Sequence, residues 1–83
     1  MENELIKQSF EPKSTLIKKV EYSYFETNEK RMNERMLIEF TTGQIHEYQC
    51  TEKDYLGIAM SESAGKHWHK NIKGILTCKI IKR

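Results

Sequence analysis

The sequence predicts a small α+β domain, in which an antiparallel sheet packs against two short helices. A chain of 83 residues supports one hydrophobic core. Apolar residues alternate on both sides of Thr41-Thr42-Gly43, a pattern typical of a β-hairpin. Two segments with capping residues and helical apolar spacing follow it. We therefore expect residues 14–83 to form a single domain after a lead-in at residues 1–13.

The lead-in is expected to pack poorly, because it combines charged residues with Pro12 and shows no clear period. A short helix from Glu4 to Phe10 is the alternative. Residues 26–34, which are mostly polar and charged, are expected to form an exposed loop.

The first strand is expected at residues 16–24. A period of two residues places Ile17 on the opposite side from one apolar set. That set consists of Leu16, Val20, Tyr22 and Tyr24.

The next two strands, at residues 35–41 and 44–50, are expected to form a hairpin with a three-residue loop. Gly43 occupies the third loop position, which requires a left-handed backbone. This register pairs Phe40 with Gln44, Ile38 with His46 and Met36 with Tyr48. The expected inner face comprises Met36, Ile38, Phe40, His46, Tyr48 and Cys50.

Two helices are expected at residues 52–61 and 64–73, with Thr51 and Ser63 as their N-caps. In the second helix every fourth residue is apolar, which predicts a buried stripe of Ala64, Trp68 and Ile72. Gly74 is expected to end this helix. A last strand, rich in β-branched residues, is expected at residues 75–81.

The sequence composition limits the cellular compartments in which we expect this protein. No apolar run approaches the roughly 20 residues of a membrane span, and the acidic start lacks the order of a signal peptide. We therefore expect a cytoplasmic protein without a membrane partner. The two cysteines, Cys50 and Cys78, have neither the number nor the spacing of a zinc site. Their count permits a single disulfide, but without an export signal two structural thiols are expected.

A set of short motifs in a fixed order resembles a known family. They are Ser14-Thr15; Ile17, Val20 and Tyr22; the alternating Met36, Ile38 and Phe40; Gly43 and Tyr48; Tyr55; Ser63-x-Gly65; Trp68; and Ile72-Lys73. Together, over roughly Ser14 to Ile75, they resemble the KTSC domain. That family occurs at the C-terminus of some lysyl-tRNA synthetases and as small free-standing bacterial and phage proteins.

The sequence departs from the family pattern at several places. Thr51-Glu52 stands where the family has a proline, and His46, Ser61 and His69 replace an expected Tyr, Ala and Asn. The resemblance implies a small α+β domain. It suggests a role connected with RNA only through the synthetase association.

The second predicted helix carries a candidate binding surface. Four basic residues at i, i+3, i+4 and i+7 fall on one side of it, and we call them the basic row: Lys66, His69, Lys70 and Lys73. From Lys66 onward the chain holds six Lys or Arg and no acidic residue. The expected anion-binding set therefore also includes Lys79, Lys82 and Arg83, with backbone N–H groups near Ser63 and Gly65. A solvated outer helix face is the alternative interpretation.

Other chemistries are less favoured by the pattern. On a helix His67 and His69 project about 200° apart, so they cannot hold one metal ion together. An acid–base pair of a histidine and a lysine, as in an RNase, has the residue types but no sign of convergence. We expect no cofactor, no metal and no catalytic activity.

These features predict a binding module that contacts RNA or another polyanion through the basic row. The alternative is a small bacterial or phage interaction module, an inhibitor or adaptor that docks on a host protein, with a homo-oligomer as a further option. Leu37 and Ile45, on the outer face of the predicted hairpin, support that alternative. Binding of a small nucleotide near Ser63 and Gly65 is a third possibility, intermediate between these two functions.

Overall fold

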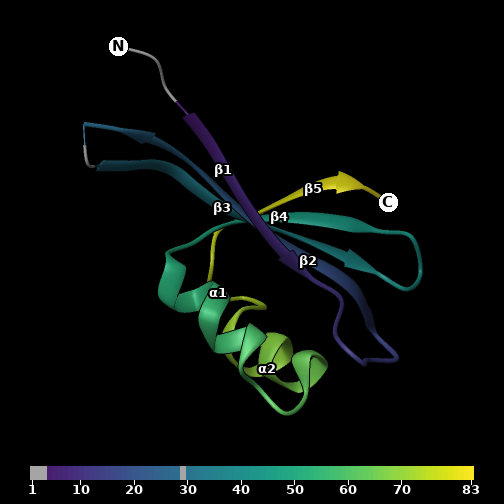
Figure 1. Ribbon diagram of the computed structural model, residues 1–83. Coiled ribbons are helices and arrows are strands. Elements are labelled where there is room, and N and C mark those ends of the chain that lie inside the picture. Colours follow the sequence, from purple (N-terminus) through teal and green to yellow (C-terminus); the bar gives the residue numbers. More distant parts are fainter. Residues whose placement is uncertain (1–3, 29) are drawn as a thin grey trace.

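A five-stranded antiparallel sheet with two helices on one face forms the molecule (Figure 1), as the computed structural model of the chain describes it for residues 4–28 and 30–83. The strands follow one another across the sheet in the order β1-β2-β3-β4-β5, and the helices lie between β4 and β5 in the chain. Their bounds are β1 Glu4–Phe10, β2 Ile17–Thr27, β3 Lys30–Phe40, β4 Ile45–Gln49, α1 Glu52–Ala59, α2 Ala64–Asn71 and β5 Cys78–Lys82. The predicted α+β fold class is confirmed.

The amino-terminal segment is an edge strand. Residues 4–10 pair with β2 in antiparallel register, from Glu4 opposite Glu26 to Phe10 opposite Val20. The alternative of a helix from Glu4 to Phe10 is therefore wrong, and this part of the expected lead-in pairs with the sheet. Ile6 and Phe10 share a strand face and pack against the core, which explains why the segment is extended.

The long β2–β3 hairpin replaces the loop expected at residues 26–34. Thr27 pairs with Lys30, and the hairpin extends past the helices (Figure 1). Its charged residues are compatible with a strand because most of this end is exposed. Arg31 stabilises it by binding Glu52 of α1 at 2.9 Å and by lying 4.6 Å from the centre of the Tyr24 ring.

Two irregularities in the β2–β3 register change which side chains face the core. One lies between Ile17 and Lys19, and it turns Ile17 inward, where it is fully buried. Leu16, expected on the inner side, remains exposed, so the predicted sides of these two residues are wrong. The second lies between Ser23 and Phe25, opposite Asn33, whose backbone φ is 55°.

The β3–β4 hairpin has the predicted register. Met36 pairs with Tyr48 and Ile38 with His46, and the Phe40 N–H donates to the Gln44 carbonyl at 2.8 Å. Gly43 has a φ of 95°, which is the left-handed conformation that the loop requires.

The helix caps are also as predicted, whereas some boundaries differ. The Asp54 carboxylate accepts the Thr51 N–H at 2.9 Å, and the Ser63 hydroxyl accepts the Lys66 N–H at 3.3 Å. Both helices are shorter than expected by two residues, and the last strand begins at Cys78 rather than at residue 75. Gly74, with a φ of 75°, follows the end of α2.

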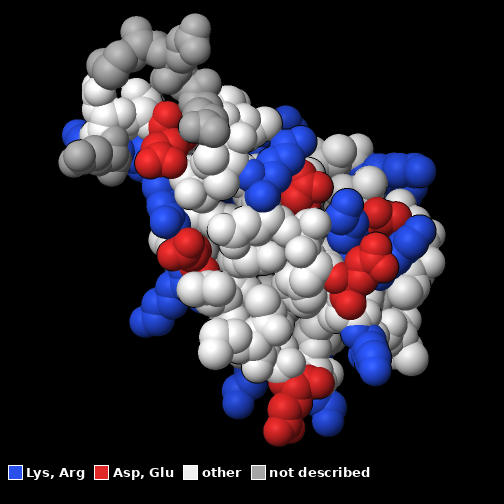
Figure 2. All heavy atoms as spheres, in the orientation of Figure 1, with Lys and Arg blue, Asp and Glu red and all other residues white. Residues whose placement is uncertain are grey.

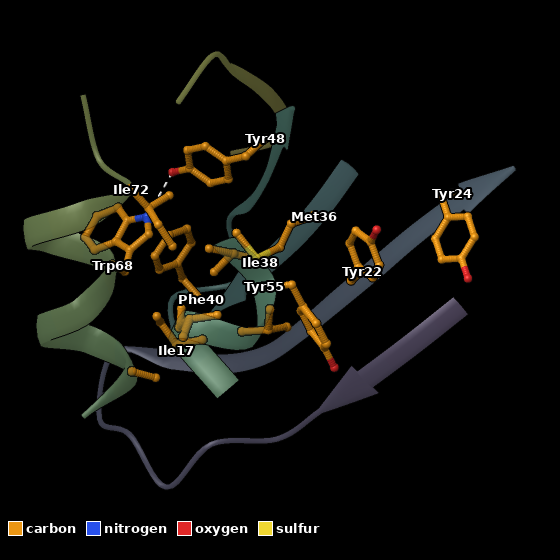
Figure 3. Close-up of a cluster of buried hydrophobic side chains, with 13 residues drawn as sticks. Ile17, Tyr22, Tyr24, Met36, Ile38, Phe40, Tyr48, Tyr55, Trp68 and Ile72 are labelled. Carbon is orange, nitrogen blue, oxygen red and sulfur yellow. Dashed lines mark hydrogen bonds between the residues drawn. The ribbon is translucent and has the colours of Figure 1, made fainter. Parts of the chain in front are cut away.

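The core lies between the sheet and the helices (Figure 3). The Tyr22 and Tyr55 rings stack with centroids 5.1 Å apart, which attaches α1 to β2. Trp68 anchors α2 by packing edge-on against Phe40 and donating its indole N–H to the Tyr48 hydroxyl at 2.9 Å. Ala64 and Ile72 are buried with it, so the predicted stripe of α2 is confirmed.

Candidate functional site

Three residues of the basic row, Lys66, His69 and Lys70, lie on α2, whereas Lys73 lies in the turn after it, because the helix ends at Asn71. Lys66, His69, Lys70 and Lys73 are all exposed. Among the described residues none of the three lysines forms an ion pair, because the ion pairs there involve other cations. The Lys73 ammonium lies 5.5 Å from the centre of the Trp68 ring, which draws this side chain toward the buried stripe. The row therefore presents positive charge that the chain itself does not neutralise.

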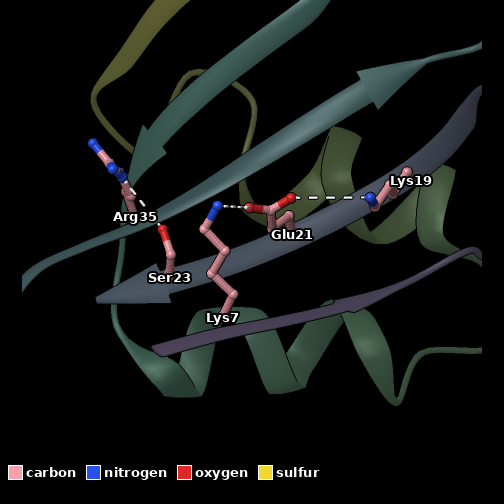
Figure 4. Close-up of polar contacts among 5 residues, drawn as sticks. All are labelled: Lys7, Lys19, Glu21, Ser23 and Arg35. Atoms are coloured by element: carbon pink, nitrogen blue, oxygen red, sulfur yellow. Dashed lines mark hydrogen bonds and ion pairs between the residues drawn. The ribbon is translucent and has the colours of Figure 1, made fainter. Parts of the chain in front are cut away.

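Charges on the outer face of the sheet are arranged differently. Glu21 binds Lys7 at 3.8 Å and Lys19 at 4.0 Å, as Figure 4 shows. Lys18 lies 3.6 Å from Glu39. In Figure 2, Lys and Arg side chains stand beside Asp and Glu side chains over much of the molecule. Lys7, Lys18 and Lys19 are thus each close to a carboxylate, in contrast to the lysines of the basic row.

The carboxyl-terminal cations do not all extend the basic row. Lys79 pairs with Glu47 of β4, whose side chain points to the outer face, so Lys79 points away from the helices. Lys82 pairs with Ile45 at the last position of β5, and Arg83 follows it. The sequence suggested one continuous basic surface, whereas the sheet separates Lys79 from α2.

Ser63 and Gly65 are engaged within the chain. The Ser63 hydroxyl already accepts the Lys66 N–H as the N-cap. Gly65 faces the segment before β2, because a Cβ placed on it would lie 3.5 Å from the Ser14 hydroxyl and 3.6 Å from Leu16. Ser63 therefore caps α2, and Gly65 lets the start of α2 lie close to the segment before β2.

The three histidines lie in different surroundings. His46 contacts the Phe40 ring edge-on, and its Nδ1 lies 3.3 Å from the Tyr48 hydroxyl. His67 faces Gly57 of α1, where an added Cβ would lie 3.1 Å from its Nε2, and its Nδ1 lies 3.4 Å from the Asn71 amide. In the described ranges, 4–28 and 30–83, no group of three His, Cys, Asp or Glu side chains is placed to hold a metal ion.

Leu37 and Ile45 are half-buried on the outer face of the sheet. They line a hollow of about 130 Å³ together with Lys19, Glu21 and Glu39. The two apolar side chains are thus surrounded by charged ones, so they form only a small apolar contact area.

A polar hollow of about 430 Å³ lies between β3 and the end of β4. Its lining includes Arg31, Glu34, Arg35 and Cys50. Most of these groups have partners. The Glu34 carboxylate accepts the buried Tyr22 hydroxyl at 2.6 Å, and the Arg35 Nε donates to the Ser23 hydroxyl at 3.3 Å. Burial, together with the nearby Asp54 and Glu34 carboxylates, raises the pKa of Cys50 to about 12, so the thiol stays protonated at neutral pH.

An apolar groove between α1 and α2 has no counterpart in the sequence analysis. It measures about 660 Å³ and is lined by the apolar side chains of Leu56, Met60 and Ile75, with Gly57 and His67 where the helices meet. We call it the α1–α2 groove. Sequence patterns do not predict it because Ile75 is expected in a strand, whereas in the structure it lies beside Leu56 and Met60. The signal that the sequence offered for this groove is the apolar pair Leu56 and Met60 at the edge of the buried face of α1.

No protein-family model matches the sequence, and a comparison with curated proteins finds no similar chain. The resemblance to the KTSC domain therefore stays a prediction. Neither helix in the part of the chain that the structure describes is long and apolar enough to cross a membrane.

Proposed function

We propose that this protein is a non-enzymatic module that binds RNA or another polyanion through Lys66, Lys70 and Lys73, with His69 beside them. The observation that carries the proposal is that three neighbouring exposed lysines, Lys66 and Lys70 on α2 and Lys73 just after it, form no ion pair among the described residues, whereas Lys7, Lys18 and Lys19 near the outer face of the sheet do. Exposed cations that lie close together attract phosphates and release the counterions condensed on the nucleic acid.

The surroundings of the row favour phosphate contacts over base contacts. Trp68 is only 9% exposed and donates its N–H to Tyr48, so its ring is not available as a platform for stacking bases. Among the exposed side chains of the row there is no aromatic ring other than the imidazole of His69. We therefore expect binding that depends weakly on nucleotide sequence, because phosphate contacts carry no sequence information.

The test is a titration of fluorescent duplex and single-stranded nucleic acid at increasing salt concentration. With three phosphates neutralised, the logarithm of the duplex association constant should fall with the logarithm of the salt concentration at a slope of about −2.7. For a single strand the slope should be about −2.1. Replacing Lys66, Lys70 and Lys73 by Gln should abolish most of this slope.

A matched control carries Lys18, Lys30 and Lys79 replaced by Gln, which changes the net charge equally on other surfaces. This control is expected to keep most of the affinity. The proposal is wrong if both triple variants lose affinity to the same extent, or if the unmodified protein shows no salt-dependent binding. Measuring both variants by circular dichroism verifies that they are folded.

We further propose a cytoplasmic location, which the free thiols of Cys50 and Cys78 support. The alternative function, docking on a host protein through Leu37 and Ile45, receives less support because charged residues surround this pair.

A further inference from the structure

His69 differs from the other residues of the basic row in the chemistry of its side chain. Lysine side chains stay charged at neutral pH, whereas histidine is the side chain that ordinarily changes its charge between pH 5 and 8. His69 stands three residues after Lys66 on α2, so the two side chains are neighbours on the helix surface. The basic row therefore holds three positive charges with a neutral imidazole and four with a protonated one.

The imidazole of His69 is open to solvent and to a bound anion. Its ring is exposed and meets the edge of the Trp68 ring, with centroids 6.3 Å apart. Trp68 is itself held by Phe40 and by the Tyr48 hydroxyl, so this neighbour is fixed. In the part of the chain that the structure describes, the side chain of His69 forms no hydrogen bond and no ion pair. Both ring nitrogens are therefore available to a ligand.

The charged residues around His69 on its own helix are lysines. Lys66 and Lys70 are exposed on α2, and Lys73 follows the helix with its ammonium 5.5 Å from the centre of the Trp68 ring. The first turn of α2 has no acidic residue, and from Lys66 onward the chain has none. Within residues 4–28 and 30–83, no carboxylate oxygen lies within 4.0 Å of a His69 ring nitrogen. An anion that binds at the row is thus the partner that a protonated His69 would gain.

The elements packed against α2 meet it with uncharged groups near this side. The segment before β2 approaches the helix at Gly65 through Ser14 and Leu16. The sheet meets the indole of α2 with the Tyr48 hydroxyl, which stays uncharged at neutral pH because burial raises its pKa to about 12. The lysines and the bound anion therefore dominate the electrostatics at His69.

The other two histidines lie outside the basic row. His67 is half-buried on the side of α2 that faces α1, and its Nδ1 lies 3.4 Å from the Asn71 amide. His46 is half-buried on β4, where its Nδ1 lies 3.3 Å from the Tyr48 hydroxyl. A change of charge on either one takes place away from the exposed lysines, so substitution separates their effects from that of His69.

We propose that polyanion binding at the basic row is coupled to protonation of His69. This inference rests on the proposed function, since it concerns the same surface. A phosphodiester that binds beside Lys66 and Lys70 stabilises the imidazolium, which becomes a fourth cation in contact with the ligand. The bound state then holds more protons than the free state, so the association constant rises as the pH falls through the range in which histidine titrates.

The test is the duplex titration repeated at about pH 5.5 and at about pH 8, on the two sides of histidine titration. The expected salt slope is about −2.7 at the higher pH and about −3.6 at the lower pH, where His69 adds a fourth phosphate contact. At equal salt the affinity should be about twofold or more higher at the lower pH. Calorimetry at about pH 6.5 in buffers of different ionisation enthalpy should show uptake of protons on binding.

Two substitutions of His69 and one control sharpen the test. His69→Gln should bind with a slope of about −2.7 at both pH values and take up no proton. His69→Lys carries a permanent charge, so its slope should be about −3.6 at both. His67→Gln, which removes a histidine outside the row, should keep the full pH dependence. Because His69 is exposed, both variants at this position should unfold at the temperature of the unmodified protein.

The inference is overturned by equal slopes at the two pH values in the unmodified protein. It is also overturned by a pH dependence that persists in His69→Gln or disappears in His67→Gln, since the proton would then bind elsewhere. In all these cases the salt-dependent binding through the lysines leaves the polyanion proposal in place. Binding without salt dependence at either pH, or no binding, would overturn both proposals together.

Discussion

Single residues in the core decide how the second helix is attached. Trp68 is the only Trp, and its indole N–H has one partner, the Tyr48 hydroxyl, which also lies near His46. The sequence predicted that Trp68 faces inward, because its spacing with Ala64 and Ile72 is visible in the chain. Its partner was not predictable, since Tyr48 is on a strand 20 residues away and the contact depends on how α2 lies against the sheet.

Tyr48→Phe is expected to lower the free energy of unfolding by about 1–3 kcal/mol, because the buried indole N–H loses its acceptor. Urea denaturation followed by Trp fluorescence measures the change. Tyr55→Phe is the matched control, since the described structure shows no hydrogen bond from the Tyr55 hydroxyl. Equal losses in the two variants would contradict this assignment.

Cys50 gives the molecule a pH dependence on the alkaline side. Burial raises the pKa of its thiol to about 12 in the folded protein, against about 8.5 for an exposed thiol. The unfolded chain releases the proton first, so the stabilising contribution is complete below about pH 8.5 and is lost as the pH rises toward 12. Cys50→Ala should therefore flatten the fall of the unfolding free energy between pH 8.5 and 10.

This comparison is made by urea denaturation at several pH values. Cys78→Ala, at an exposed position of β5, is the control and should keep the fall that the unmodified protein shows. A Cys50→Ala variant with the same pH profile as the unmodified protein would refute the role of this thiol. Above pH 10 the buried Tyr48, whose pKa is also raised to about 12 by burial, adds to the fall in both variants.

At the scale of elements, the structures that depend on local sequence signals were predicted correctly, and those that depend on tertiary contacts were not. The β3–β4 hairpin carries its own turn chemistry in Gly43 and its own alternation, and the caps Thr51 and Ser63 are encoded within four residues. The register shifts in β2 and β3 have no such local signal. One shift accompanies the burial of Ile17, and the pairing of β2 with β3 continues through residues expected to form a loop.

The irregularity at Asn33 is expected to limit which residues this position accepts. With a φ of 55°, Asn33 occupies the left-handed region, where a β-branched side chain clashes with its own backbone. Asn33→Val should lower the unfolding free energy by about 1–2 kcal/mol. Asn33→Gly, which adopts this conformation without strain, should keep or slightly raise it. Thermal unfolding of both variants tests the expectation, and a Val variant as stable as the Gly variant would contradict it.

At the scale of the whole molecule, the first strand completes the sheet on one side. Its sequence alternates poorly, with Gln8 between Ile6 and Phe10 on the inner face, and this explains why pattern analysis left it out. Phe10 packs against Tyr55 with ring centroids 5.7 Å apart, so the strand also touches α1. The α1–α2 groove also depends on the assembled molecule, because it exists only when α1, α2 and the segment at Ile75 have packed together.

Removing residues 1–11 is expected to destabilise the protein by about 3 kcal/mol or more, because Phe10 and Ile6 leave the core and the edge of β2 is uncovered. Urea denaturation measures the loss, and size-exclusion chromatography should show association through the exposed edge. An unchanged unfolding free energy would mean that the segment is dispensable.

The position of the helices within the chain has a consequence for the order of assembly. Strands β1 to β4 follow one another through short connections, so their pairings close small loops and can form early. The last strand joins β4 only after residues 50–77 have been placed. Every residue of β5 is exposed, so little burial holds it there. The β5 edge of the sheet can therefore detach and re-form as a local unfolding unit, while the core stays folded.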